Sequence, residues 1–327
     1  MAYSVLRFDM RAPAFSPAST AELYGAALDM ATWADEHGFS ALTLSEHHGV
    51  EDGYLPSPLP MAGLLAGRTR RIPISVVALL APLYDPLKLA EDLAVLDIAS
   101  GGRITICAGM GYRPDEYTMF GRDFAKRGVL LDEVLEFLLR AWPGEPFEHR
   151  GATVRLTPKP LTQPLPPIRV GGQSKAGARR AARFGLPFQP ATNDPAILAV
   201  HREECEKRGV DPVVLPPGAG EMVFVSEDPD RTWAEIGPHL LYEAMSYASW
   251  QPAGQRSAVH SEAETIEALR KEGKYLVLTP EECVARAEAQ APHGAFVLYP
   301  LCGGTPPELA WRSLELYASR VLPRIQS

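Results

Sequence analysis

The sequence predicts an α/β fold, specifically a (β/α)8 barrel with loop insertions. Short apolar runs alternate with amphipathic helices along most of the 327 residues, and no change of composition marks a domain boundary. About eight strand candidates appear in this alternation, which is the order of a parallel barrel. We therefore expect a single barrel domain over residues 1–327.

The first half of the chain shows the alternation most clearly. Strands are expected at Val5–Met10, Ala41–Ser45, Ile74–Leu80 and Ile104–Gly109. Between them, Ser19 followed by Glu22 forms a capping box that predicts a helix start. Asp85 followed by Pro86 predicts another, because proline fits the first helical position. Later helices are marked by Leu131, Val134, Leu135 and Leu138 and by the segment through Phe184.

The second half continues the pattern with two interruptions. Strands are expected at Ile168–Val170, Glu221–Val225 and Ala295–Tyr299, and helix starts at Asp194-Pro195, Thr279-Pro280 and Thr305–Glu308, the last helix running to about Leu322. The insertions are Pro143–Pro167, which contains a hairpin-like stretch Phe147–Thr157, and Ser249–Glu262. Barrel loops of this length are usually lids, substrate walls or dimer contacts.

Composition excludes several classes of protein. A formal net charge of −8 argues against nucleic acid, because phosphate binding needs clustered cations, and against anionic membrane surfaces. The four cysteines form no C-x-x-C pair, which indicates a reducing compartment and no structural zinc. No secretory signal and no membrane-spanning run are evident, so we expect a cytoplasmic protein.

The run Glu46-His47-His48 follows the second predicted strand, where a barrel strand passes into an active-site loop. Histidine titrates near neutral pH, so either His47 or His48 can move protons. The alternatives are a loop histidine bonded to backbone and a metal site. A metal site needs further ligands at other strand ends, and the sequence offers no convincing set.

Glycines follow two other predicted strands. Gly171 and Gly172, with Gln173, Ser174 and Gly177, stand at a strand-to-helix junction, where free amides attract a phosphate. The Walker and G-x-G-x-x-G patterns are absent, and a plain glycine turn is the alternative. Gly109, Met110 and Tyr112 follow the fourth strand. The apolar stretch Ser75–Pro86 is typical of core but can also form a shelf for a flat ring.

Together these motifs resemble the bacterial luciferase-like family of flavin-dependent oxidoreductases. The resemblance rests on Gly38-Phe39 before Glu46-His47-His48, on Asp85–Asp92, Leu96–Arg103, Gly109–Tyr112, Glu116-Tyr117, Phe120-Gly121, Gly172-Gln173-Ser174 and Pro300–Gly304. It covers about three quarters of the chain, mostly residues 1–190 and 295–327.

The resemblance implies a barrel with FMN at its mouth, the phosphate on Gly172-Gln173-Ser174 and His47 as the functional histidine, oriented by Glu46 or His48. It also implies a cis peptide at Val77-Ala78. Luciferases have an arginine where this chain has Met110, so either Arg113 replaces it or the site is neutral there. The expected cofactor-binding residues are Val77, Ala78, Gly109, Met110, Tyr112, Arg113, Gly171, Gly172, Gln173, Ser174 and Gly177.

The predicted function is therefore oxygenation of a small organic substrate by reduced FMN and O2, with His47 assisting proton transfer. A separate flavin reductase and a homodimer are the expected partners. A deazaflavin-dependent hydride transfer on the same fold is the nearest alternative. A metal-dependent barrel hydrolase and a flavin-binding protein without turnover are the others.

Overall fold

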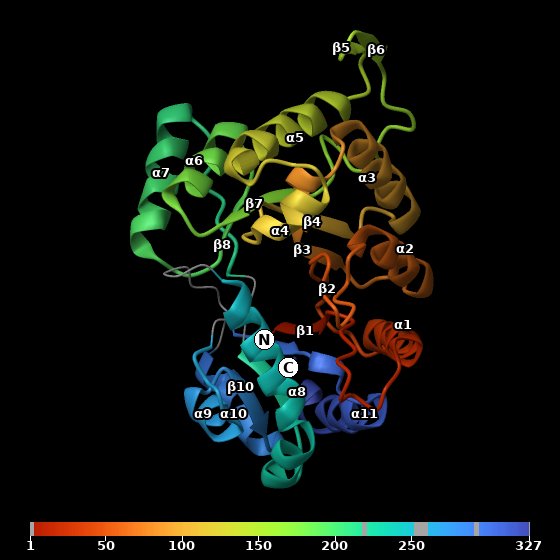
Figure 1. Ribbon diagram of the computed structural model, residues 1–327, viewed down its shortest axis with the longest axis vertical. Helices are drawn as coiled ribbons and strands as arrows, with labels where there is room; N and C mark the ends of the chain where they lie inside the picture. The colour runs from red at the N-terminus through yellow and green to blue at the C-terminus, as the bar shows by residue number, and fades with distance from the viewer. Residues whose placement is uncertain (1–2, 218–220, 252–260, 291–293, 327) are drawn as a thin grey trace. The chain divides into compact units, whose positions relative to one another are not determined.

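The computed structural model describes residues 3–217, 221–251, 261–290 and 294–326 (Figure 1). It contains two compact units, which we describe separately. Unit 1 comprises Met1–Leu44, His48–Pro56 and Ala219–Ser327, and unit 2 comprises Ser45–His47 and Ser57–Gly218. The single barrel domain stays a prediction, and residues 252–260 of the second predicted insertion lie outside the described residues.

Unit 1 is a parallel sheet with its helices. The strands are β1 (Tyr3–Phe8), β2 (Ala41–Leu44), β9 (Glu221–Val225), β10 (Tyr275–Leu278) and β11 (Ala295–Leu298), in the order β10-β9-β11-β1-β2. The helices are α1 (Thr20–Glu36), α8 (Pro229–Trp250), α9 (Ile266–Glu272), α10 (Pro280–Gln290), α11 (Pro307–Leu316) and α12 (Leu322–Ile325). A plain β/α repeat would place these strands in chain order, but β9 lies between β10 and β11.

Unit 2 holds a second set of parallel strands, β3 (Ile74–Leu80), β4 (Ile104–Gly109), β7 (Ile168–Gly172) and β8 (Phe188–Pro190), paired in that order. Its helices are α2 (Pro58–Arg68), α3 (Pro86–Ser100), α4 (Pro114–Met119), α5 (Arg127–Ala141), α6 (Lys175–Phe184) and α7 (Pro195–Arg208). Helix α2 packs against α3, and α6 against α7 (Figure 1). The predicted hairpin is present as antiparallel β5 (Phe147–His149) and β6 (Ala152–Val154).

The local signals of the sequence explain most of these elements. The capping box at the start of α1 forms as predicted, since Ser19 accepts from the Glu22 amide and Glu22 accepts from the Ser19 amide. Asp85 caps α3 by accepting from the amides of Leu87 and Lys88. Strand β3 is rich in β-branched residues, and Ile74, Val76 and Leu79 are buried, as expected for a central strand.

Several elements differ from the prediction. Strands β8 and β10 and helices α2, α4, α8 and α9 were not predicted, and α8 extends to Trp250, into the start of the second predicted insertion. The predicted last helix is divided, because α11 ends at Leu316 and a π-helical turn, Tyr317–Val321, separates it from α12. Among the described residues, no helix is both long and apolar enough to cross a membrane.

Candidate active site

His47 lies at the centre of a hydrogen-bonded group in unit 2. It is 5% exposed, and its Nδ1 is 2.8 Å from Oε1 of Glu116, which is fully buried at the first turn of α4. Its Nε2 is 3.2 Å from the hydroxyl oxygen of Tyr112, and the two rings meet edge to face at 5.5 Å. A carboxylate at Nδ1 favours the tautomer with hydrogen on that nitrogen, which directs Nε2 toward Tyr112.

The carboxylate of Glu46 has a different position from the one the sequence indicated. Its Oε2 accepts from the amide of Leu80 at 2.6 Å, and its Oε1 accepts from the hydroxyl of Tyr84 at 2.7 Å. Burial and the charge of Glu46 raise the pKa of Tyr84. Glu46 therefore fixes the end of β3, while Glu116 is the carboxylate at Nδ1 of His47.

The end of β3 has the backbone that the resemblance implied. The Val77-Ala78 peptide is cis, and the carbonyl of Val77 accepts from the Ser45 hydroxyl at 2.9 Å. Opposite it on β4, a Cβ added to Gly109 would lie 2.7 Å from Cβ of Ala78, so only glycine fits there. The two strand ends thus approach each other closely, with Val77 and Ala78 half-buried.

The glycine motif forms a turn from β7 into α6. A Cβ added to Gly171 would lie 2.7 Å from Sγ of Cys107, and one added to Gly172 would lie 3.6 Å from Cα of Gly177. Ser174 caps α6 by accepting from the Gly177 amide at 3.1 Å. The residues of the turn after Gln173, from Ser174 to Ala176, are exposed. We call Gly171–Gly177 the glycine cradle.

The glycine cradle fits a phosphate-bearing ligand. The first amides of a helix have no acceptor within the helix, and the helix dipole favours an anion there. Lys175 adds a cation beside these amides, and its side chain is exposed. A flavin mononucleotide has such a terminal phosphate, so the donor set of Gln173, Ser174 and Lys175 is suited to hold it.

The structure also shows the contacts of Met110 and Arg113, which follow β4. Arg113 is 8% exposed and pairs with Asp115 and with Glu116, the latter at 3.6 Å, so its charge lies beside the His47 group. Arg180 of α6 instead has Nη1 3.9 Å from Sδ of Met110, and its Nε donates to Asp132 at 2.5 Å. The cation nearest to Met110 in these contacts thus comes from α6, which the sequence did not indicate.

His48 belongs to unit 1, where it is half-buried. Its place relative to His47 is therefore not described, and its predicted catalytic role stays a prediction. Within the described residues, no group of three or more His, Cys, Asp or Glu side chains is arranged to hold a metal ion.

Unit 1 contains a buried ionic cluster after β1 that the sequence did not reveal. Arg11 is fully buried, and it donates to Asp52 at 2.6 Å and to Glu243 at 2.5 Å. Three aromatic rings face its guanidinium within 5.4 Å, those of Tyr54, Tyr242 and Trp250. Burial raises the pKa of the nearby Asp9 carboxyl, Glu243 raises it further, and Arg11 lowers it. We call Arg11, Asp52, Glu243 and Asp9 the Arg11 cluster.

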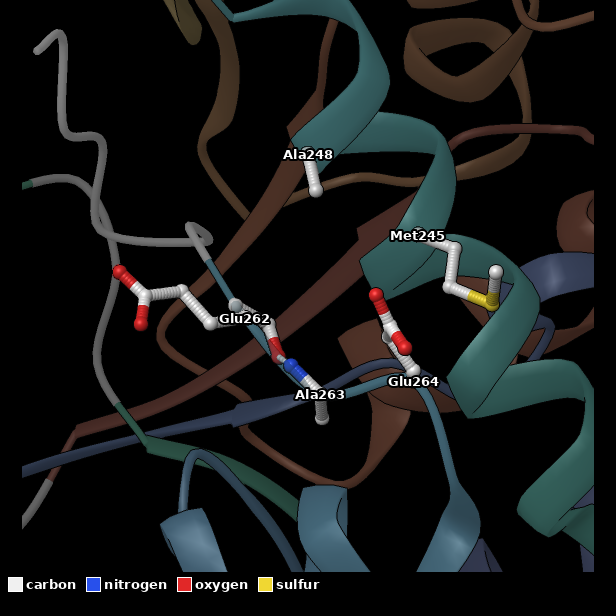
Figure 2. Close-up of a pocket in the computed structure, with 6 residues that line it drawn as sticks. Met245, Ala248, Glu262, Ala263 and Glu264 are labelled. Atoms are coloured by element: carbon white, nitrogen blue, oxygen red, sulfur yellow. Dashed lines mark hydrogen bonds between the residues drawn. The ribbon is translucent and has the colours of Figure 1, made fainter. Parts of the chain in front are cut away.

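A separate hollow of about 340 Å³ lies in unit 1. Met245 and Ala248 of α8 line it together with residues 261–264 (Figure 2). Figure 2 shows that the carboxylate of Glu262 points away from Met245, whereas Glu264 lies beside it. None of the described residues that line it is a predicted site residue.

Comparisons with known proteins agree with the family indicated by the motifs. The family model described as luciferase-like monooxygenase matches residues 7–297. The oxygenase component of the flavin-dependent trigonelline monooxygenase from Acinetobacter baylyi is 30% identical over 175 residues, covering 51% of this chain and 48% of that protein. The chain matches about half the length of such curated relatives.

Solved structures confirm the predicted fold class, the luciferase-like (β/α)8 type. Monooxygenase RslO1 from Streptomyces bottropensis has a TM-score of 0.74 at 26% identity, covering 99% of each chain. Two structures show the fold alone. The oxygenating constituent of 3,6-diketocamphane monooxygenase from Pseudomonas putida, in complex with FMN, has a TM-score of 0.71 at 21% identity, and the match covers 99% of each chain. An F420-dependent secondary alcohol dehydrogenase has a TM-score of 0.70 at 17% identity, and the match covers 100% of each chain.

Proposed function

Since the chain belongs to the luciferase-like monooxygenase family, we propose that it is a flavin-dependent monooxygenase that uses reduced FMN and O2 to oxygenate a small organic substrate. The observation that carries this proposal is the glycine cradle, in which close packing at Gly171 and the exposed residues Ser174 to Ala176 at the start of α6 leave room and amide donors for a phosphate. Gly172, Gln173 and Ser174 would hold that phosphate. The half-buried Val77 and Ala78 and the buried Gly109 would face the flavin ring.

Bound reduced flavin supplies the electrons that activate O2, so the protein has to bind, orient and move protons. His47 is the group for the last task, because its buried ring is held by Glu116 at Nδ1 and can exchange a proton at Nε2. General acid–base catalysis of this kind typically raises the reaction rate by about 10²–10⁴-fold. Glu46 supports the end of β3 through Leu80 and Tyr84.

Titration with FMN, and with riboflavin as the matched ligand without phosphate, tests the cradle. We expect FMN to bind at least about tenfold more tightly than riboflavin, a difference of about 1.4 kcal/mol, because only FMN reaches the amides of α6. Equal affinities would refute the cradle. The variant His47→Ala should retain FMN affinity and lose turnover, and equal losses in both would refute the role of His47.

The deazaflavin coenzyme F420 is the second candidate, favoured by the fold shared with the F420-dependent dehydrogenase. Hydride transfer to a carbonyl also needs a proton donor, so the His47 group is compatible with it. Titration with F420 beside FMN distinguishes the two. Tight F420 binding with weak FMN binding would replace the proposed function by hydride transfer.

We also propose two partners, a flavin reductase and a second copy of this chain. The relative from Acinetobacter baylyi is an oxygenase component, so we infer that a separate reductase supplies reduced flavin. Chemically reduced FMN should then support turnover without any reductase. A homodimer is inferred from exposed apolar side chains on α2 and α3, those of Leu64 (56%), Val95 (52%) and Ile98 (41%). Light scattering gives the mass in solution. A cytoplasmic location remains a prediction.

A further inference from the structure

A row of hydrogen-bonded polar side chains crosses the four strands of unit 2. Arg169 of β7 lies at its centre, and its Nε donates to Oε1 of Gln189 on β8 at 2.5 Å. Its Nη1 donates to Oγ1 of Thr105 on β4 at 3.1 Å, and its Nη2 donates to Oγ of Ser75 on β3 at 2.5 Å. Thr105 in turn donates to Ser75 at 2.9 Å. The guanidinium of Arg169 is therefore held in one position by three strands besides its own.

The positive charge of Arg169 has no negative partner in this row. All three acceptors are neutral, and no carboxylate among the residues that the structure describes forms an ion pair with Arg169. By contrast, Arg113 and Arg180 of the same unit pair with Asp115 and Asp132. Arg169 is also half-buried, so water solvates its charge only in part. A fixed, partly desolvated cation of this kind favours an anionic ligand nearby.

Arg169 lies on the face of the sheet that leads to the proposed flavin site. Side chains alternate along a strand, so Arg169 and Gly171 share a face and differ by a rise of about 6.6 Å. Cys107 is the register partner of Arg169 on β4, and a Cβ added to Gly171 would lie 2.7 Å from its sulfur. In the same way Ser75 precedes Val77 by two residues on β3. The row is thus one layer of side chains before the strand ends that would carry the ring.

We propose that Arg169 makes this site select the anionic, reduced form of the flavin over the neutral, oxidised form. This inference rests on the proposed function and deepens it. Two electrons and one proton convert the neutral oxidised ring into an anion, and the phosphate is unchanged between the two forms. A fixed cation attracts the anionic ring and leaves the affinity of the neutral ring nearly unchanged. Opposite unit charges about 10 Å apart, at an effective dielectric constant of about 20, attract enough to change an affinity by more than tenfold.

Arg169 also links four strands, so the variants have to separate its charge from its hydrogen bonds. Arg169→Gln removes the charge, whereas Arg169→Lys keeps the charge and loses the planar fork that reaches three acceptors. A purely structural role would make both variants similar. Arg155, which follows β6, is exposed, so Arg155→Gln is the control for the loss of one positive charge elsewhere in unit 2.

Anaerobic titration of the protein with oxidised and with reduced flavin measures the selection directly. We expect wild-type protein to bind reduced FMN at least about tenfold more tightly than oxidised FMN, a difference of about 1.4 kcal/mol. The ratio should be similar for riboflavin, because the phosphate contributes equally to both forms. It should approach one in Arg169→Gln and stay near the wild-type value in Arg169→Lys and Arg155→Gln.

Two results would refute the inference. Equal affinities of the wild-type protein for oxidised and reduced FMN would overturn it even if no variant at Arg169 folds. A ratio that is unchanged in Arg169→Gln, or that falls as far in Arg169→Lys as in Arg169→Gln, would show that the charge is not the cause.

The absorbance spectrum of the bound reduced flavin gives a second readout, because it differs between the anionic ring and its protonated, neutral form. A nearby cation favours the anion and so lowers the pKa of the reduced ring. In a pH titration the anionic spectrum should therefore persist to lower pH in wild-type protein than in Arg169→Gln. Identical titrations of the two proteins would contradict the role of Arg169.

These outcomes separate the inference from the proposed function. If FMN binds more tightly than riboflavin but both redox forms of FMN bind equally, the proposed function stands and the role of Arg169 is wrong. If FMN binds no more tightly than riboflavin, the cradle and the proposed function fail, whatever the variants at Arg169 show.

Discussion

Replacing Arg11 by methionine should destabilise unit 1 strongly. Arg11 is fully buried and is the shared cation of Asp52 and Glu243, at 2.6 and 2.5 Å. It joins three segments that are distant in sequence, namely the end of β1, the loop 48–56 and helix α8. Methionine keeps much of the side-chain volume among the aromatic rings but removes the charge and the donors.

The magnitude follows from what the two carboxylates retain. Asp52 still accepts from the Tyr54 amide and the Tyr242 hydroxyl, and Glu243 still accepts from the Tyr299 hydroxyl. Breaking a buried pair by removing one partner costs about 3–5 kcal/mol, since the charge left behind is uncompensated. We expect Arg11→Met to cost this amount. For a domain this large, at about 2 °C per kcal/mol, the Tm should fall by about 6–10 °C.

Thermal unfolding followed by circular dichroism measures the shift. Arg11→Lys is the control, because it keeps the charge and loses the planar fork, and it should have an intermediate Tm. Adding Glu243→Gln to Arg11→Met should recover part of the loss, since one stranded carboxylate is removed. A loss below about 1 kcal/mol for Arg11→Met, ordinary for any substitution, would refute the reasoning.

Three further predictions concern single groups. The pKa of Asp9 in the folded chain is raised above its unfolded value of about 3.9, so the folded chain holds a proton that the unfolded chain has already lost. The free energy of unfolding therefore falls as pH rises from the unfolded pKa of Asp9 to its folded pKa. The variant Asp9→Asn should reduce this fall, as unfolding experiments at several pH values would show. Gly171→Ala should lower the free energy of unfolding by about 1–3 kcal/mol and weaken FMN binding, because the added methyl group would press on Cys107. The control Gly67→Ala, with open space around the added carbon, should change neither. Wild-type FMN affinity in Gly171→Ala would contradict the cradle. Burial raises the pKa of Cys107 to about 11, so iodoacetamide at neutral pH should label it only on unfolding, as mass spectrometry would show; rapid labelling of the folded protein would contradict its burial.

The elements predicted correctly depend on neighbours in the chain. The capping box of Ser19 and Glu22, the Asp85-Pro86 start of α3 and the β-branched run of β3 act over a few residues, so the sequence alone contains their cause. Helix α8 was not predicted although its start carries the local signal of α3, with Asp228 as the cap and Pro229 at the first helical position; it contains Pro238, which normally interrupts a helix. The turn from β7 into α6 was predicted because Gly171 and Gly172 before a Ser174 cap form a short local pattern, and its phosphate-binding role stays a prediction.

The sequence by itself determined the α/β class, the family and the residues at the strand ends. Only the tertiary structure decided their partners. Glu116 meets His47 across 69 residues and Glu243 meets Arg11 across 232, and it is Glu116, rather than Glu46, that contacts Nδ1 of His47. The physical reason is that charges and hydrogen bonds between distant segments depend on how strands and helices pack, which no local pattern encodes.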